Sequence, residues 1–130
     1  MMHLAYQPIG IPDLHQPLMA RFEQIVAQFS DQIAVVAENA LTYQVLNQRS
    51  NQLAQAILAQ DNDPKAVVTI LGGQQTKTIV AMLAALKIGR IFTVLDPKFP
   101  PERLRYIYAD SGSELIITGA DHFDLVTKLG

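Results

Sequence analysis

The chain contains no cysteine, which excludes a disulfide framework and a thiolate metal site. Ten basic and twelve acidic side chains give a net charge of −2, so no positive field attracts nucleic acid or an anionic membrane. Residues 1–17 carry neither the cationic start nor the apolar core of a signal peptide. The longest uncharged apolar run, residues 79–86, is far too short to span a bilayer. We therefore expect a cytoplasmic protein that binds neither nucleic acid nor membrane.

What the chain does have is the composition of a globular protein. Its 130 residues suit one compact domain, and 49% of them are apolar against 17% charged. The mean hydropathy of +0.16 is slightly high for a free-standing domain. Residues 1–17 contain three prolines and little periodicity, so we expect an irregular lead-in followed by a folded part over residues 18–130.

The first part of the folded region predicts a helix, a hairpin and a second helix. Apolar residues recur at helical spacing over residues 18–29. Short β-rich runs at residues 33–37 and 41–43 flank Glu38-Asn39, a pair suited to a turn. Thr42 is expected to accept a backbone N–H at the start of the second helix, as an N-cap. The apolar face expected on that helix consists of Leu46, Ser50, Leu53 and Ile57.

From residue 66 onward, short apolar strands alternate with amphipathic helices. The expected strands are residues 66–71, 91–95 and 114–118, and the expected helices are residues 76–88, 100–110 and a last one capped by Asp121. On the first of these helices Ile79, Leu83 and Leu86 are expected to face inward. This alternation predicts an α/β fold with a mainly parallel sheet and flanking helices.

The stretch "ILGGQQTKT", residues 70–78, looks like a phosphate-binding loop. That motif needs glycine, four residues, then Gly-Lys-Ser/Thr. Here Lys77 is preceded by Thr76, and Leu71 occupies the position of the other glycine. We therefore interpret Gly72-Gly73 as a strand-to-helix corner, although such a corner can still present N–H groups to an anion.

Other polar residues give no catalytic constellation. The three histidines have no second ligand at metal spacing, Asp61 and Asp63 fit a solvated loop, and the Ser111-Gly112-Ser113 stretch has no histidine partner. Tyr106 and Tyr108 are two residues apart, so they should point to different sides of their helix. The histidines are His3, His15 and His122. We assign no catalytic, cofactor-binding or metal-binding residue to this chain.

One stretch is more specific: "LKIGRIFTVLDPKFPPERL", residues 86–104, resembles a segment of the amino-acid adenylation domains of nonribosomal peptide synthetases. These domains belong to the acyl-adenylate-forming superfamily of AMP-binding enzymes, with acyl-CoA synthetases and luciferase. The stretches "SDQIAVV", "LTYQVLNQRSNQLAQAI" and "YADSGSELIIT" resemble further segments of the family in the same order. The resemblance covers residues 18–118. It departs from the family pattern at Val45, where a glutamate would complete a capping box, and at Arg90, where a smaller residue is usual.

The resemblance implies a parent enzyme that uses ATP and Mg²⁺ to convert an amino acid into aminoacyl-AMP. The acyl group would then pass to the phosphopantetheine thiol of a carrier-protein domain. The family's ATP-binding loop, selectivity pocket and catalytic lysine would all lie later in such an enzyme. The present segment would thus be an N-terminal scaffold, inactive alone and without its own cofactor, whose partner is the remainder of the adenylation domain.

Two alternatives remain open: the front end of an acyl-CoA synthetase, or a free-standing non-catalytic interaction module of the same ancestry. A scaffold separated from its domain would expose apolar faces and sheet edges. We therefore expect the isolated chain to self-associate.

Overall fold

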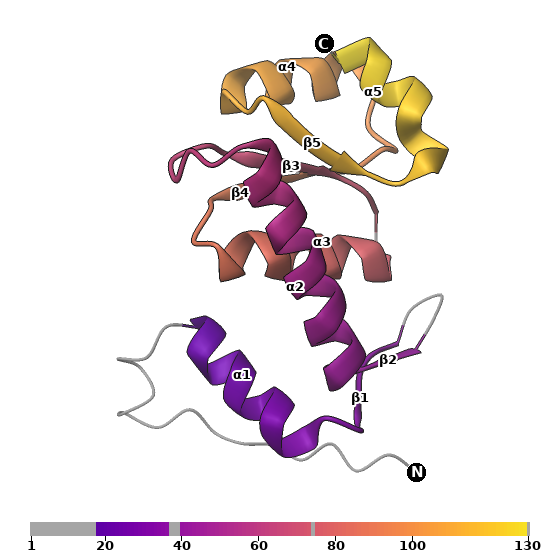
Figure 1. Ribbon diagram of the computed structural model, residues 1–130. Coiled ribbons are helices and arrows are strands. Elements are labelled where there is room, and N and C mark those ends of the chain that lie inside the picture. The colour runs from indigo at the N-terminus through magenta and orange to yellow at the C-terminus, as the bar shows by residue number, and fades with distance from the viewer. Residues whose placement is uncertain (1–17, 37–39, 74, 130) are drawn as a thin grey trace.

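The computed structural model describes residues 18–36, 40–73 and 75–129. The elements along the chain are α1 (Leu18–Phe29), β1 (Ile33–Val36), β2 (Ala40–Thr42), α2 (Tyr43–Gln60), β3 (Val68–Leu71), α3 (Thr76–Lys87), β4 (Phe92–Leu95), α4 (Pro101–Ser111), β5 (Leu115–Thr118), the 3₁₀ turn η2 (Ala120–His122) and α5 (Phe123–Leu129). The expected α/β class is confirmed (Figure 1). The expected turn at Glu38-Asn39 and the lead-in lie outside the described residues.

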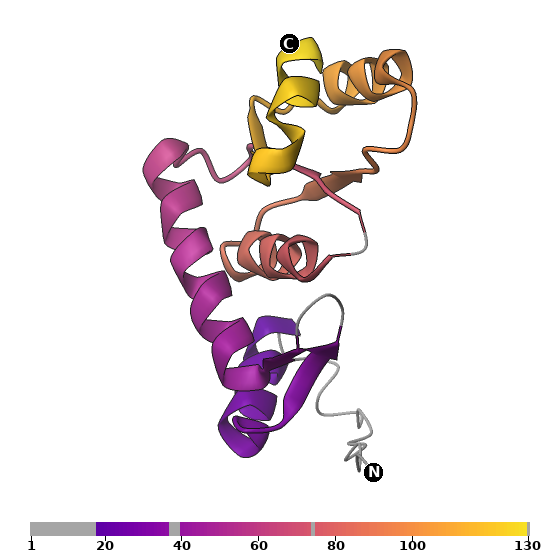
Figure 2. The ribbon, with the colours of Figure 1, turned by 90° about the vertical axis from the view of Figure 1, so that its right-hand side faces the viewer.

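Three strands form a parallel sheet in the order β4-β3-β5. Ile70 in the central strand lies opposite Val94 on one side and Ile117 on the other. Helices α2 and α3 cover one face of the sheet, and α4 and α5 cover the other (Figures 1 and 2). The parallel sheet expected from the alternation of strands and helices is therefore confirmed.

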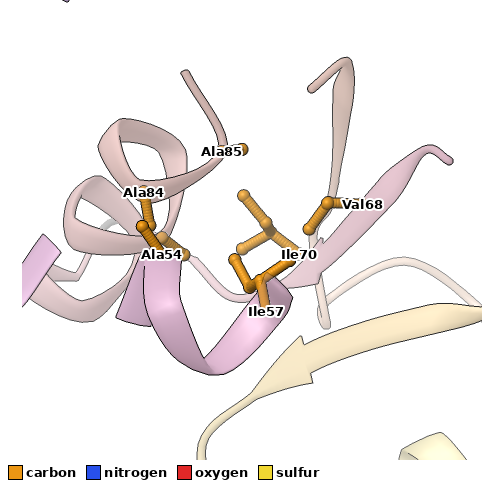
Figure 3. Close-up of a cluster of buried hydrophobic side chains, with 7 residues drawn as sticks. Ala54, Ile57, Val68, Ile70, Ala84 and Ala85 are labelled. Atoms are coloured by element: carbon orange, nitrogen blue, oxygen red, sulfur yellow. The ribbon is translucent and has the colours of Figure 1, made fainter. Parts of the chain in front are cut away.

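The core on the α2/α3 face is built from small residues on the helices and large ones on β3. Val68 and Ile70 are almost completely buried against Ala84 and Ala85 of α3 and Ile57 of α2 (Figure 3). Alanine side chains allow the helix backbone to approach the sheet closely. In such a close-packed core, the loss or gain of a single methyl group changes the stability. β3 is therefore the most deeply buried strand, with all four of its residues inside.

The inward face of α3 differs in part from the prediction. Its fully buried apolar residues are Val80, Ala81, Ala84 and Ala85, whereas Ile79 and Leu83 are only partly buried. Ile79 and Leu83 instead pack on a separate cluster, together with residues of α1, α2 and the hairpin. Ile79 and Leu83 thus face inward as predicted, but toward this cluster, and Leu86 is only partly buried. Because α3 lies between two layers, its closest contact with the sheet is made by the alanines.

The opposite face of the sheet holds a leucine-rich core. Leu71 and Leu95 come from the ends of β3 and β4, and Leu104 and Leu129 come from α4 and α5. Helix α4 begins with Pro101, where a missing N–H costs no helical hydrogen bond. It ends at Gly112, whose φ of +69° is readily adopted only by glycine. Asp121 was expected to cap the last helix, but it lies inside η2, ahead of the start of α5.

Helix α1 and strands β1 and β2 form a separate layer, the N-terminal layer, beside α2 and α3. Strands β1 and β2 pair antiparallel, which confirms the expected hairpin. The Thr42 side chain accepts a hydrogen bond from Val45 N at 3.2 Å, so the predicted N-cap is also confirmed. Leu41, Leu46 and Val80 are the buried members of the cluster beneath this layer.

Lys87 of α3 joins this layer to α2 and α3 through several contacts. Lys87 Nζ donates to Glu23 Oε1 of α1 at 2.9 Å, and to Asn47 Oδ1 and Asn51 Oδ1 of α2 at 2.5 and 2.7 Å. The same ammonium lies 5.3 Å from the centre of the Phe22 ring. Because only 8% of the Lys87 side chain is exposed, these three oxygens take the place of water around its charge.

Candidate functional site

The carboxyl end of β3 is the position at which a parallel α/β sheet most often binds a ligand. There the chain turns sharply through Gly72 and Gly73 into α3. A Cβ atom on Gly72 would lie 2.5 Å from Thr78 Oγ1, whereas one on Gly73 would meet nothing within 4 Å. Gly72 therefore has a steric reason to be glycine: its backbone packs directly against the first turn of α3.

Three N–H groups of this corner, those of Gly72, Gln75 and Thr78, are already used inside the protein. Gly72 N donates to Leu95 O at 3.1 Å, which extends the pairing between β3 and β4. Gln75 N donates to Gly73 O at 2.9 Å, and Thr78 N donates to Gln75 O at 3.1 Å. A phosphate-binding loop instead directs several N–H groups at one anion. These bonds support the interpretation of residues 70–78 as a corner of the scaffold.

A cavity lies beside this corner, between the ends of β3 and β5 and the helices α2 and α3. Gly72 and Gly119 form its strand side, and Leu53 lies on its α2 side. Arg49 and Lys77 also line it, and both are exposed. Its volume is about 180 Å³. Typical small-molecule sites measure roughly 300–1,000 Å³, so this cavity is too small for a nucleotide.

The chemistry around the cavity is not catalytic. No carboxylate, imidazole or thiol is present among the described residues that line it. Within residues 18–36, 40–73 and 75–129 no group of three His, Asp, Glu or Cys side chains could hold a metal ion. In the same ranges no helix is long and apolar enough to cross a membrane.

The acidic and histidine candidates are placed as loop and surface residues. Asp61 Oδ1 accepts from Asp63 N, and Asp63 Oδ1 accepts from Lys65 N, both at 3.0 Å, which closes two successive turns after α2. His122 Nε2 lies 3.5 Å from Asp121 Oδ2, its neighbour in sequence. His3 and His15 lie outside the described residues.

The serine and tyrosine candidates take part in packing and turns. Ser113 is buried, and its hydroxyl lies 2.7 Å from Val67 O, which ties the start of β5 to the start of β3. Ser111 Oγ donates to Tyr108 O at 2.6 Å. Tyr106 is exposed, whereas Tyr108 packs on the leucine-rich core, so the two point to different sides as expected.

One buried charge was not recognised from the sequence as a core residue. Arg90 is only 3% exposed, and its Nη2 donates to Asp61 O at the end of α2, at 2.5 Å. Its Nε and Nη1 have no hydrogen-bond partner among the described residues. The family resemblance had marked Arg90 as a departure, which was the available signal. Its position under the carboxyl end of α2 suits a cation, because the carbonyl groups of a helix accumulate negative charge there.

Comparison with known proteins identifies the family. Residues 22–129 match the family described as AMP-binding enzyme, and the chain belongs to this family. It is 42% identical over 107 residues to chondramide synthase cmdD of Chondromyces crocatus, covering 79% of this chain and 3% of that protein. It is 34% identical over 110 residues to tyrocidine synthase 1 of Brevibacillus parabrevis, covering 84% of this chain and 10% of that protein.

A solved structure shares the fold. A benzoate CoA ligase from Burkholderia xenovorans superposes with a TM-score of 0.77 at 20% identity, covering 85% of this chain and 23% of that one. The chain thus spans a tenth or less of the two synthases and about a quarter of the ligase. The family expected from residues 86–104 is confirmed, and at this identity the structural likeness shows the fold alone.

Proposed function

We propose that this chain is the N-terminal scaffold of a ligase that activates an amino acid as aminoacyl-AMP for nonribosomal peptide synthesis. The match of residues 22–129 to AMP-binding enzymes carries the proposal. The sequence relatives that are 34% and 42% identical are peptide-type synthases, which favours an amino acid over the fatty or aromatic acid of a CoA ligase. The likeness to the benzoate CoA ligase supports the alternative only at the level of fold.

The reaction of the parent enzyme has two steps. A carboxylate oxygen of the amino acid attacks the α-phosphorus of ATP, and pyrophosphate leaves with the electrons of the broken P–O bond. A carrier-domain thiol then loses its proton and attacks the acyl carbon to form a thioester, and AMP leaves with the electrons of the broken C–O bond. Both steps need positive charge or N–H donors directed at the developing negative charge, and Mg²⁺ would supply part of this in the first step.

The described residues do not fit a Mg–ATP site. They contain no group of three His, Asp, Glu or Cys side chains that could hold the metal, the cavity between β3, β5, α2 and α3 is too small for the nucleotide, and the N–H groups of Gly72, Gln75 and Thr78 are bonded internally. The role proposed for this chain is therefore architectural. Its sheet and helices support the ATP-binding part of the domain, and no step of the reaction is assigned to its side chains.

Partners follow from the same proposal. The chain would pack on the remainder of its adenylation domain, and the whole enzyme would deliver the acyl group to a phosphopantetheine-bearing carrier domain. Without that remainder we expect the isolated chain to self-associate through its exposed apolar side chains. Because the chemistry consumes ATP, the proposal places the enzyme in the cytoplasm.

A chimera tests the function. The matching segment of tyrocidine synthase 1 is replaced by this chain, and amino-acid-dependent exchange of labelled pyrophosphate into ATP is measured. We expect exchange in the chimera and none in a version that lacks the segment. Calorimetry of the isolated chain should show no saturable binding of Mg–ATP. A chimera that folds but does not catalyse exchange, or an isolated chain that binds Mg–ATP, would contradict the proposal.

A further inference from the structure

The outer edge of β4 is the least protected part of the sheet. β4 pairs only with β3 among the described strands, so its other edge is open. Val94 within the strand is 41% exposed, Ile91 just before it is 73% exposed, and Phe99 just after it is 38% exposed. All four residues of β5, the opposite edge strand, are partly buried. The apolar exposure is therefore concentrated along β4.

The main chain of β4 has free hydrogen-bonding positions on that edge. Val68 N donates to Ile91 O, and Gly72 N donates to Leu95 O, so the carbonyls of Ile91 and Leu95 face β3. Successive residues of a strand direct their main-chain groups to opposite edges. The N–H and C=O groups of Phe92 and Val94 therefore point away from β3, toward the open side.

Apart from its short length of four residues, the edge lacks the features that natural proteins use to keep a sheet edge from pairing. β4 reads Phe-Thr-Val-Leu, with no lysine, no proline and no glycine. Its register with β3 is regular over four residue pairs, so no bulge interrupts the strand. Parallel sheets are normally covered on both faces and seldom end in an exposed apolar strand. Val94 lies on the face that α2 and α3 cover over β3, yet it is 41% exposed, so those helices reach Phe92 but leave Val94 uncovered.

We propose that β4 is an interior strand of the parent domain: a further strand from the remainder of the same polypeptide pairs with Phe92 and Val94, and the segment that carries it covers Ile91, Val94 and Phe99. This inference rests on the proposed function. The length of the relatives supports this occupant, because the fold of this chain makes up 23% of the single chain of the benzoate CoA ligase. More than three quarters of such a chain is then available to supply the strand.

Hydrogen exchange, read residue by residue, tests the pairing. In the isolated chain at low concentration the amides of Phe92 and Val94 should exchange rapidly. In the chimera with tyrocidine synthase 1 they should exchange more than about 100-fold more slowly, because they become bonded inside a sheet. The amide of Thr93 serves as the internal control, since it faces β3 and should be protected in both proteins.

A proline variant sharpens the test. Proline at position 94 removes an N–H that bonds nothing within this chain but would bond the added strand. We expect Val94→Pro to leave the urea midpoint of the isolated chain unchanged while lowering the protection of Phe92 and the yield of folded chimera. Val94→Ala keeps the N–H and should retain the protection.

The outcomes separate this inference from the proposed function. Rapid exchange of Phe92 and Val94 in a chimera that catalyses pyrophosphate exchange overturns the strand pairing and leaves the function standing. Protection in a folded chimera without activity supports the pairing and contradicts the function. Protection of Phe92 and Val94 in the isolated chain at a concentration where its mass is monomeric would show that the edge is already covered within this chain, and it would overturn the strand pairing. A chimera that fails to fold, while native tyrocidine synthase 1 folds, counts against both proposals.

Discussion

The three-stranded sheet and the N-terminal layer are held in different ways. The sheet is sandwiched between two apolar clusters, and its central strand is completely buried. The cluster beneath the N-terminal layer has three buried apolar residues, and the shortest side-chain contacts between this layer and the helices α2 and α3 centre on the Lys87 ammonium. The hydrophobic effect stabilises in proportion to the apolar area that is buried, and it does not depend on the exact orientation of the side chains. A buried ammonium, by contrast, is stable only when its hydrogen-bond acceptors stay in place. The sheet should therefore tolerate the loss of polar contacts, and the N-terminal layer should not.

The largest effect is expected in the sheet. Ile70→Ala removes three carbons from a β3 side chain that is 2% exposed and packs against α2 and α3, and it should lower the free energy of unfolding by about 3–4 kcal/mol. Urea unfolding followed by circular dichroism measures this. Ile91→Ala is the matched control, because the same atoms are lost from a residue that is 73% exposed. If the two variants cost the same, the burial described for β3 is wrong.

The next effect is expected at the corner between β3 and α3. Gly72→Ala places a Cβ 2.5 Å from Thr78 Oγ1, so the Thr78 side chain or the backbone must shift, at a cost of about 2 kcal/mol. Gly73→Ala meets no atom within 4 Å and should be nearly neutral. Adding Thr78→Ala to the Gly72→Ala variant should recover part of the loss, because the clashing hydroxyl is then absent. Thermal unfolding of the four proteins checks this, and a failure to recover would place the strain elsewhere.

A smaller but more localised effect is expected in the N-terminal layer. Lys87→Met keeps much of the side-chain volume but leaves oxygens of Glu23, Asn47 and Asn51 without their donor, at a cost of about 1.5 kcal/mol. Hydrogen exchange should increase in α1 and β1 and stay unchanged in β3. Lys65→Met, at an exposed position, is the control. An equal increase in hydrogen exchange in β3 would show that the sheet and the N-terminal layer are not stabilised independently.

The smallest effect is expected at the start of α2. Thr42→Ala removes the hydroxyl that accepts from Val45 N and should cost about 1 kcal/mol, whereas Thr42→Ser keeps the hydroxyl and most of the stability. Chemical unfolding of the two variants is the measurement. Because Val45 replaces the glutamate of a capping box, no second cap bond compensates, and a loss near zero for Thr42→Ala would contradict the capping role.

The comparison of the two regions also explains which features could be predicted from the sequence. The strands, the parallel sheet and the Thr42 cap follow from apolar periodicity and local turn chemistry, which act over a few residues. Ile79 and Leu83 of α3 do pack on an apolar cluster, but the alanines that face the sheet were not predicted. Both sides of α3 are covered, and periodicity alone does not say which layer approaches more closely. Lys87 and Arg90 were missed as buried charges, since their partners lie 64 and 29 residues away in the sequence.

At the candidate site too, features set by local sequence could be predicted, and features set by long-range packing could not. The absence of both motif glycines from residues 70–78 was visible in the sequence, and it led to the corner interpretation. The physical reason for Gly72 was not visible, because the contact with Thr78 depends on the angle at which α3 leaves the strand. The open edge of β4 could not be located either, since strand order is set by long-range packing rather than by any local pattern.

The most direct test of the central claim is the mass of the natural polypeptide that carries this sequence, measured by immunoprecipitation with an antibody against the segment and intact-mass or gel analysis. The account predicts a species far larger than the 14.3 kDa of this chain, with the rest of an adenylation domain joined to it. A natural species of 14.3 kDa, with no larger form, would contradict the assignment as part of an adenylating enzyme and would favour a free-standing interaction module.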